Sequence, residues 1–409
     1  MPRPSVIIAL SNGGLGLIGP NLNGTVGLLV ASPAAPTAGY GVPFLCKSKD
    51  AVNAAFANVL NADVAAGIVT GFFAEAAEGT SVYIMAMAQT TTLTTLLLPA
   101  NADKLINFAN GAIRLLGVIK YPDGGTYVPT VTDGFDADVH TAVTAAQTLA
   151  NNWFLLKKPF RVLVEGFAFA DATAAKDYAT EANSNVGVVV GEIDDSTSLA
   201  LLFVLGRASA VDPQQNIGRI KSGSLAIPDA AVLKIGATVM ESVPVSDLEL
   251  LYDKRYITFE RNEIASGYII SDDNMLTAST DDYSNLAYGR VIDNAVRVSF
   301  LTYYRELKDD VEVDDGGRLA PVVEKALENA VESDIDQFMR PQLSKKKGGT
   351  ADAECLVNPD AVKYAPLYAA NNIVTPNFNI LQTGAVYLFL KLRPKGCLKH
   401  LYVYLGYTV

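Results

Sequence analysis

Short apolar stretches rich in β-branched residues alternate with longer amphipathic stretches between about residue 42 and residue 209. The short stretches are typical of strands and the longer ones of helices. Strands are predicted at residues 42–46, 81–89, 113–122, 160–166 and 185–193, and helices at residues 48–76, 102–113, 136–156, 170–183 and 196–209. Ser48 is expected to cap the first of these helices. Strands that alternate with helices at this spacing indicate a largely parallel sheet with helices on its faces.

The pattern changes after about residue 250. A β-hairpin is predicted at residues 252–271, amphipathic helices at 286–307 and 320–339, and strands at 384–392 and 397–409. Pro321 stands where a helix can start. One face of the first late helix carries an apolar stripe, made of Ile292, Ala295, Val296, Phe300, Tyr304 and Leu307. The chain is therefore expected to combine an α/β part with an α+β part.

The N-terminal segment has a different texture. Residues 5–10 and 25–32 are β-prone and apolar, and the residues between them are rich in Gly, Asn and Pro. A run of Pro, Gly and Ala follows at residues 32–43. We therefore expect the first thirty residues to form an extended arm, in contrast to the compact part that follows.

The composition bounds the class of protein. The chain has 409 residues, of which 50% are hydrophobic and 18% charged, so it is long and apolar enough to fold into two or three domains. Its formal net charge of -11 argues against a nucleic-acid-binding face, which has to be basic. No apolar run has the length of a membrane span or a signal-peptide core, so a soluble protein made in the cytoplasm is expected.

Few residues of the kind that bind transition metals are present. Cys46, Cys355 and Cys397 lie far apart, and His140 and His400 are the only histidines. Zinc sites need several such ligands at close spacing, so no metal site and no cofactor are predicted. The cysteines fit buried thiols in a reducing compartment.

Two patterns could indicate an enzyme. Residues 14–19 match GxGxxG, but no helix follows, so a flexible arm is the favoured interpretation. Glu165, Glu192, Asp194 and Asp195 fall at predicted strand ends, where open sheets place active sites. No catalytic serine motif accompanies them. A cytosolic α/β enzyme that uses Glu165 and Glu192 therefore stays the less favoured alternative, and no catalytic residue is predicted.

A third acidic group precedes the first late helix. It consists of Asp272, Asp273, Asp281 and Asp282. The spacing does not fit a calcium-binding loop, which needs acidic ligands at alternate positions and a central Gly. These aspartates are expected instead to cap turns and the following helix, and to pair with Arg290 or Arg297.

Several segments in this order resemble one family. Residues 42–89 contain a strand, a helix ending in two Phe, and a Tyr-bearing strand. Residues 206–225 lead away from the α/β part, and residues 256–297 combine a hairpin, Gly-Tyr, Asp-Tyr and a long helix with two Arg. Together they resemble the sheath protein of contractile phage tails and of related bacterial injection machines. The resemblance covers most of the chain at the level of pattern.

The resemblance implies a structural protein that polymerises. Sheath subunits form a helical polymer of stacked, hexameric rings around a tail tube, with baseplate and terminator proteins as further partners, and they contract to drive the tube through an envelope. The chain would then be assembled in the bacterial cytoplasm and form part of a virion tail or an injection particle. It would not bind nucleic acid, and it would not insert directly into a membrane. Another self-assembling tail component, of the tube or the baseplate, is the alternative within this class.

The resemblance also implies a division of labour along the chain. Residues 1–30 would be an arm that joins the inner domain, residues 31–249 an outer α/β domain, and residues 250–409 an inner α+β domain that faces the tube and ends in a second β arm. Both arms would add strands to a neighbouring subunit. The residues expected in this strand exchange are Val6, Ile7, Ile8, Leu401, Val403 and Leu405.

A charged surface is the second predicted contact. Glu324, Glu328, Glu332 and Asp336 recur every four residues on the helix at 320–339. Four like charges on one face are unfavourable unless a basic partner covers them. We therefore predict that Glu324, Glu328 and Glu332, or the loop with Lys345, Lys346 and Lys347, contact the tube or a neighbouring subunit. A face exposed to solvent is the alternative.

Overall fold

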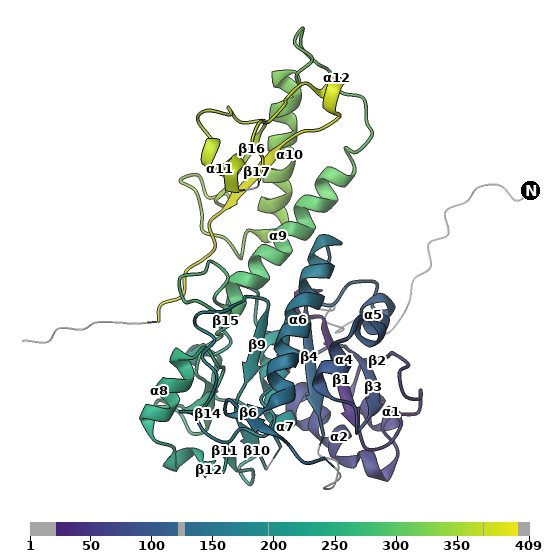
Figure 1. The fold of residues 1–409 in the computed structure, drawn as a ribbon, viewed down its shortest axis with the longest axis vertical. Coiled ribbons are helices and arrows are strands. Elements are labelled where there is room, and N and C mark those ends of the chain that lie inside the picture. Colours follow the sequence, from purple (N-terminus) through teal and green to yellow (C-terminus); the bar gives the residue numbers. More distant parts are fainter. Residues whose placement is uncertain (1–21, 122–126, 195, 371, 400–409) are drawn as a thin grey trace, which may run out of the picture.

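A six-stranded sheet lies at the centre of the larger part of the molecule (Figure 1). The computed structural model describes residues 22–121, 127–194, 196–370 and 372–399. The strand order is β2 (Phe44–Cys46), β3 (Val82–Ala88), β1 (Val26–Ser32), β4 (Leu115–Lys120), β7 (Arg161–Glu165) and β9 (Val186–Val189). All neighbouring pairs are parallel except β2 and β3. The predicted, largely parallel sheet is therefore confirmed.

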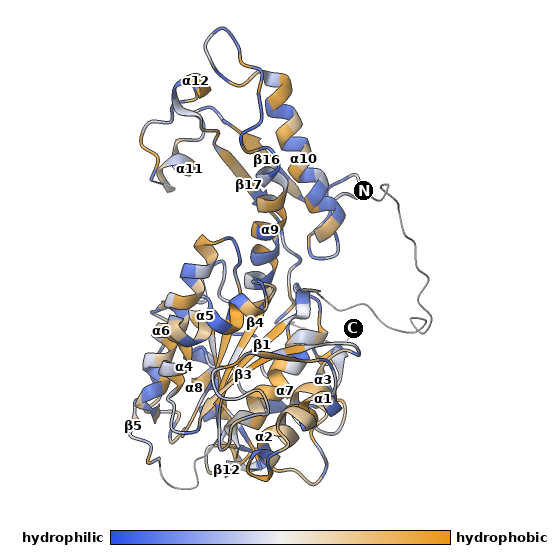
Figure 2. Cartoon of the chain, turned by 90° about the vertical axis from the view of Figure 1, so that its right-hand side faces the viewer, coloured by the Kyte–Doolittle hydropathy of each residue, from blue (hydrophilic) through white to orange (hydrophobic). Residues whose placement is uncertain are grey.

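Helices cover both faces of this sheet. They are α1 (Lys49–Ala55), α2 (Ala62–Gly67), α3 (Phe73–Glu75), α4 (Leu93–Leu97), α5 (Pro99–Phe108), α6 (Ala137–Leu155) and α7 (Thr197–Ala210). Figure 2 shows α4, α5 and α6 on one side of the strands and α1, α2, α3 and α7 on the other. The strands between them are buried on both faces, which explains why they consist of continuous apolar runs.

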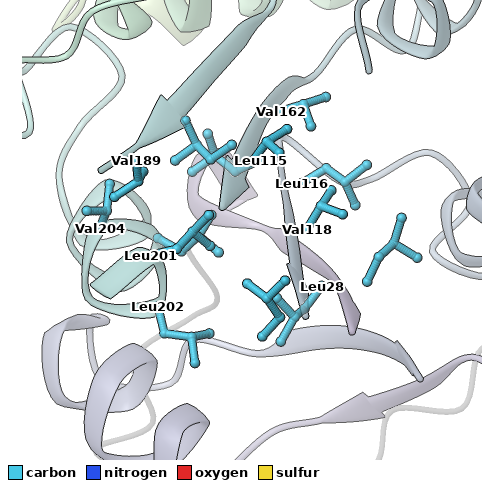
Figure 3. Close-up of a cluster of buried hydrophobic side chains, with 14 of the residues drawn as sticks. Leu28, Leu115, Leu116, Val118, Val162, Val189, Leu201, Leu202 and Val204 are labelled. Carbon is cyan, nitrogen blue, oxygen red and sulfur yellow. The ribbon is translucent and has the colours of Figure 1, made fainter. Parts of the chain in front are cut away.

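The core between the sheet and α7 consists of branched aliphatic side chains (Figure 3). Leu201 and Leu205 on α7 are fully buried, as is Leu28 on β1, and all three lie around Gly117 on β4. Gly117 allows this close contact, because a Cβ there would lie 2.2 Å from Cδ1 of Leu205. The helix packs onto β4 at the one position where the strand has no side chain.

Local caps fix where several helices begin. Ser48 Oγ accepts a hydrogen bond from the Ala51 amide at 3.2 Å, as the sequence predicted. The side chains of Thr92, Asp136 and Ser196 cap α4, α6 and α7 in the same way. Each satisfies an amide that the first helical turn leaves without a partner.

Small antiparallel pairs and one helix surround the main sheet. They are β5 (Val131–Thr132) with β6 (Phe135–Asp136), β8 (Ala182–Asn183) with β15 (Leu276–Thr277), β10 (Glu192–Ile193) with β11 (Leu233–Ile235) and β12 (Thr238–Val239), and β13 (Phe259–Arg261) with β14 (Tyr268–Ile270). Helix α8 (Val245–Asp253) precedes the last pair. The predicted hairpin at residues 252–271 is thus confirmed as β13 and β14.

A second, smaller unit lies at the far end of a long helix (Figure 1). It consists of the outer half of α9 (Leu286–Tyr304), α10 (Pro321–Met339), α11 (Ala365–Ala370), α12 (Ile380–Thr383), and the antiparallel pair β16 (Ala353–Val357) and β17 (Leu388–Leu392). Its core is formed by Val291, Ala295, Val331, Ile335, Met339, Leu343, Ala351, Ala353 and Cys355. Pro321 opens α10, as predicted.

The helix predicted at residues 170–183 is wrong. This stretch forms turns and β8. Two contacts oppose a helix here: the Asp171 carboxylate accepts the amides of Thr173 and Ala174, and Lys254 Nζ binds the carbonyl oxygens of Ala172, Thr173 and Ala175. Those carbonyls would accept hydrogen bonds from within a helix. A lysine distant in sequence therefore overrides the local propensity.

The two cores do not follow the boundaries placed at residues 30 and 249. β1 (Val26–Ser32), in the middle of the sheet, begins within the segment expected to be an arm and ends beyond it. Tyr256, Ile270 and Leu286 belong to the larger core. Packing changes along α9, which carries Leu286 in one core and Ala295 in the other. The assignment of an outer and an inner, tube-facing domain stays a prediction.

Candidate assembly interface

The β16–β17 sheet has two strands and hence two outer edges. The amides of Asn358 and Arg393 bind the carbonyl oxygens of Tyr387 and Asp352. In an antiparallel pair such bonds recur at every second residue. The amides of Cys355 and Val357 therefore point away from β17 on one edge, and those of Leu388, Leu390 and Leu392 point away from β16 on the other.

Carboxylates of α10 cover the β16 edge. Glu332 accepts a hydrogen bond from the Cys355 amide, and Glu328 accepts one from the Val357 amide, both at 3.0 Å. One turn to either side, Glu324 accepts from Asn358 Nδ2 at 3.4 Å and Asp336 accepts from the Ala351 amide at 2.6 Å. The acidic face of the helix thus lies along the strand.

The spacing of helix and strand explains this match. Four helical residues advance about 6 Å, and two strand residues advance about 6.6–6.8 Å. Successive carboxylates at i and i+4 can therefore reach alternate amides of a strand that runs antiparallel to the helix. The sequence showed the i,i+4 carboxylates but gave no partner for them, because the strand lies more than twenty residues further along the chain.

The lysine loop lies beside the same helix. Lys346 Nζ is 3.7 Å from Glu332 Oε2, and the Lys346 amide binds Thr350 to close a tight turn. Lys345 and Lys347 are exposed. The structure therefore brings the predicted acidic and basic groups together, at Glu332 and Lys346.

The β17 edge has a different character. In the parts of the chain that the structure describes, the outward amides of Leu388, Leu390 and Leu392 have no hydrogen-bond partner. Their side chains are half-buried against the small core. An edge strand with free amides is a template for a further strand. The six residues predicted for strand exchange lie outside the described residues.

Part of the predicted apolar stripe of α9 is exposed. Ala295 is buried, but Phe300, Tyr304 and the following Leu307 are 37%, 61% and 63% exposed. Phe338 on α10 is 59% exposed. The single chain therefore leaves an apolar surface on the smaller unit.

The C-terminal stretch returns from β17 to the larger part. Lys399 Nζ lies 2.5 Å from Asp272 Oδ2, and Asn216 Nδ2 donates to Asp272 and Asp273. Burial acts to raise the pKa of Asp272, but Lys399 and the hydrogen bonds hold that pKa below its usual range. Burial, with the Asp272 charge as the next cause, raises the pKa of Asp273 to about 7.

The acidic group before α9 builds structure, as predicted. Asp273 Oδ2 accepts the amide of Ala287 in the first turn of α9, and Asp281 accepts the amide of Tyr283. The predicted pairing with Arg290 or Arg297 is wrong. Both arginines donate to backbone carbonyls, Arg290 to Asn23 and Val211, and Arg297 to Gly111, Ile113 and Pro159.

A buried ion pair that the sequence did not reveal joins α9 to the sheet. Arg161 on β7 donates from Nε and Nη2 to the two Asp293 oxygens at 2.8 and 2.7 Å, with side chains 3% and 5% exposed. Gly289 makes room for it, because a Cβ there would lie 2.7 Å from Arg161 Cζ. The residue types alone give no signal for a pair separated by 132 positions.

Two of the carboxylates at the predicted strand ends bind backbone amides. Glu165 is 1% exposed and accepts the Lys120 amide at 2.5 Å, while Asp194 accepts the Val232 amide at 2.9 Å. A depression of about 450 Å³ between α4, α5 and α6 is lined by neither Glu165 nor Glu192. Among the described residues, no three His, Cys, Asp or Glu side chains are grouped to hold a metal ion. No described helix has the length and apolar character needed to cross a membrane.

Comparisons with known proteins concern the fold of the chain. A family model described as "DUF2586, N-terminal domain" matches residues 3–274. No curated protein matches the chain. Solved structures with a similar fold are the anti-feeding prophage (AFP) baseplate, at a TM-score of 0.60 and 14% identity over 100% of both chains, and the contracted AFP helical sheath, at 0.59 and 14% over 99% of each. The contracted sheath complex of PVC, an extracellular contractile injection system, has a TM-score of 0.60 at 12% identity over 99% of this chain and 98% of that chain. The chain belongs to the DUF2586 family, and its fold is that of contractile sheath proteins, as the resemblance in the sequence predicted.

Proposed function

We propose that this chain is the structural subunit of a contractile tail sheath. In this role it polymerises as stacked rings around a tail tube and contracts to drive the tube through a target envelope. The observation that carries the proposal is the likeness of fold to two contracted sheaths, those of AFP and PVC, which extends over 99% of the chain in each case. A catalytic role has no comparable support from the similar structures.

The open edge of β17 is the proposed joint between subunits. A strand from a neighbouring chain that pairs with Leu388, Leu390 and Leu392 gains backbone hydrogen bonds worth about 0.5–1.5 kcal/mol each. The arm residues Val6, Ile7 and Ile8, and Leu401, Val403 and Leu405, are the proposed donors of such strands. The β16 edge is a poorer acceptor, because the α10 carboxylates already bind its amides.

The exposed apolar side chains on the smaller unit are a proposed second contact between subunits. Phe300 and Tyr304 pack against each other with ring centroids 5.4 Å apart. A surface of this kind is covered in stable assemblies. In a ring of subunits, packing of a neighbouring chain on α9 would remove it from water.

The charged loop beside α10 is proposed to face the tube or a neighbouring subunit. Lys345 and Lys347 are exposed, and Lys346 forms an ion pair with Glu332. Glu324, Glu328 and Glu332 are proposed to take part in the same contact through the part of each carboxylate that is exposed. The proposed partners are further copies of this chain, arranged in hexameric rings, and the tube, baseplate and terminator proteins. The proposed place of assembly is the bacterial cytoplasm.

Contraction would draw on energy stored during assembly. A concerted change from an extended to a compact arrangement needs two packings of the same subunit that differ in free energy. Strand joints are suited to this, because a strand exchanged between subunits keeps them linked while their folded bodies move.

Negative-stain electron microscopy of the purified chain at high concentration tests the proposal. Long hollow tubes of uniform width are expected, and deletion of residues 1–10 should abolish them. That deletion ends well before β1, so it leaves the sheet intact. Uniform small particles from the complete chain would contradict the sheath function.

A further inference from the structure

Buried arginines cluster where α9 meets the larger part of the molecule. Arg290 and Arg297 lie on α9, Arg161 opens β7, and Arg114 directly precedes β4. Asp293 is the carboxylate among them, and Arg161 occupies both of its oxygens. The other guanidinium groups are therefore left without a carboxylate that binds them directly.

Several guanidinium atoms in this cluster have no hydrogen-bond partner within the described part of the chain. Arg290 is 3% exposed, and its Nη2 donates to the carbonyl oxygens of Asn23 and Val211, but its Nε and Nη1 donate to nothing. Nε and Nη1 of Arg114 are also buried without a partner. Buried donors of this kind are rare in native proteins and call for an acceptor.

A small cavity lies between these two side chains. Its volume is about 10 Å³, and its walls are Asn23, Arg114, Pro213, Arg290, Asp293 and Asn294. A cavity of about 10–15 Å³ holds a single water molecule. The cavity therefore holds a water molecule or a single ion of one atom, whereas a phosphate or a carboxylate side chain is too large.

The electrostatics favour a negative occupant over a neutral one. Burial lowers the pKa of Arg290 and of Arg114 to about 10 each. Burial and the charge of Arg114 lower the pKa of Arg297 to about 9. The charge of Asp212 acts to raise the pKa of Arg290, but Asp212 is itself exposed to solvent. A water molecule would satisfy two donors, whereas an anion would also offset the excess positive charge.

We propose that this cavity binds one monatomic anion, of the chloride class, between Arg114 and Arg290. The anion accepts hydrogen bonds from the unpartnered guanidinium atoms. It thereby connects α9, through Arg290, to the residue before β4. Its binding stabilises the junction between the two units of the subunit.

Bromide gives a direct test, because it replaces chloride and scatters anomalously. Crystals of the complete chain grown in sodium bromide should show an anomalous peak inside the cavity. Density in the cavity without anomalous signal would identify a water molecule and overturn the proposal, as would an empty cavity. This measurement needs no substitution.

Melting curves supply the second test. At constant ionic strength, sodium chloride should raise the Tm by about 2–4 °C relative to sodium gluconate, whose anion is too large to enter. The increment should vanish in Arg290→Met and persist in Arg305→Met, which changes an exposed arginine at the end of the same helix. Equal Tm values in the two salts, or an increment retained by Arg290→Met, would contradict the proposal. If Arg290→Met does not fold, the bromide experiment decides alone.

Discussion

Glu332 accepts a hydrogen bond from the backbone amide of Cys355, with 3.0 Å between Oε1 and the nitrogen. Glu328 repeats the contact two strand residues away, at Val357. Together they close one edge of the β16–β17 sheet with side chains of the same subunit. The edge at β17 is then the one that we propose pairs with a strand from another chain.

Glu328 and Glu332 can act as hydrogen-bond acceptors within the subunit or as charges at its surface. Replacement of both by Ala or by Gln distinguishes these two roles. Cys355 and Val357 are 2% and 5% exposed, so Ala at both glutamates leaves two amides unsatisfied. The double Ala variant should lose about 1–3 kcal/mol of unfolding free energy per amide, measured by urea denaturation. The double Gln variant keeps an acceptor and should lose less. A Gln variant that is stable yet forms no tubes would instead make the carboxylates a contact with a partner.

Proline at Leu390 should block assembly without unfolding the subunit. The Leu390 amide points away from β16, so its loss spares the β16–β17 hydrogen bonds but removes a donor from the open edge. Leu390→Pro should therefore remain folded by circular dichroism and form no tubes. Leu390→Ala, which shortens the side chain but keeps the amide, is the matched control and should still polymerise. Tubes from the proline variant would exclude this edge as the joint.

Alanine at Gly289 should weaken the junction between α9 and the sheet. The new Cβ would lie 2.7 Å from Arg161 Cζ and displace the guanidinium that binds Asp293. Overpacking of this kind costs about 1–3 kcal/mol, to be read from the urea midpoint. Gly348→Ala meets nothing within 4 Å and should change stability by less than about 0.5 kcal/mol. Equal stabilities of the two variants would show that Arg161 adjusts freely.

The raised pKa of Asp273 should make the free energy of unfolding depend on pH. Burial raises its folded-state pKa from the ordinary value of 3.8 to about 7, so the folded chain binds an extra proton between these values. The stability that this group contributes is present below about pH 4 and is lost as the pH rises through 7. Asp272, whose pKa is lowered, acts in the opposite sense and only at lower pH.

Asp273→Asn should therefore flatten the profile of unfolding free energy between pH 5 and 7. The difference in slope from the unaltered chain approaches about 1.4 kcal/mol per pH unit for one proton. Asn can keep an oxygen at the Ala287 amide, but its Nδ2 then faces the Nδ2 donors of Asn216 and Asn285, so a loss of stability that does not depend on pH is expected as well. Urea midpoints at several pH values measure the slope. Parallel profiles of the two proteins would assign the pH dependence to other groups.

The sheet was predictable because its strands are buried on both faces. β4 and β7 are buried along their whole length, and such strands stand out as unbroken apolar runs between amphipathic helices. The place of β1 was not predictable in the same way. Residues 25–32 form a recognisable strand, but a strand pattern carries no information about neighbours, and β1 lies between β3 and β4.

The residues of the interface show the same limit. The carboxylates of α10 were evident from their spacing, whereas their partners on β16 depend on contacts between distant segments. Lys254 likewise prevents a helix at residues 170–183 that local propensity favours. Contacts over long sequence distances decide these cases, and one sequence gives no register for them.

A cryo-electron microscopy reconstruction of tubes formed by the complete chain tests the central claim most directly. The account predicts a strand from a neighbouring subunit hydrogen-bonded to Leu388, Leu390 and Leu392, and the α10 carboxylates still on β16. Tubes in which the β17 edge is exposed to solvent, or is covered by the same subunit, would contradict it.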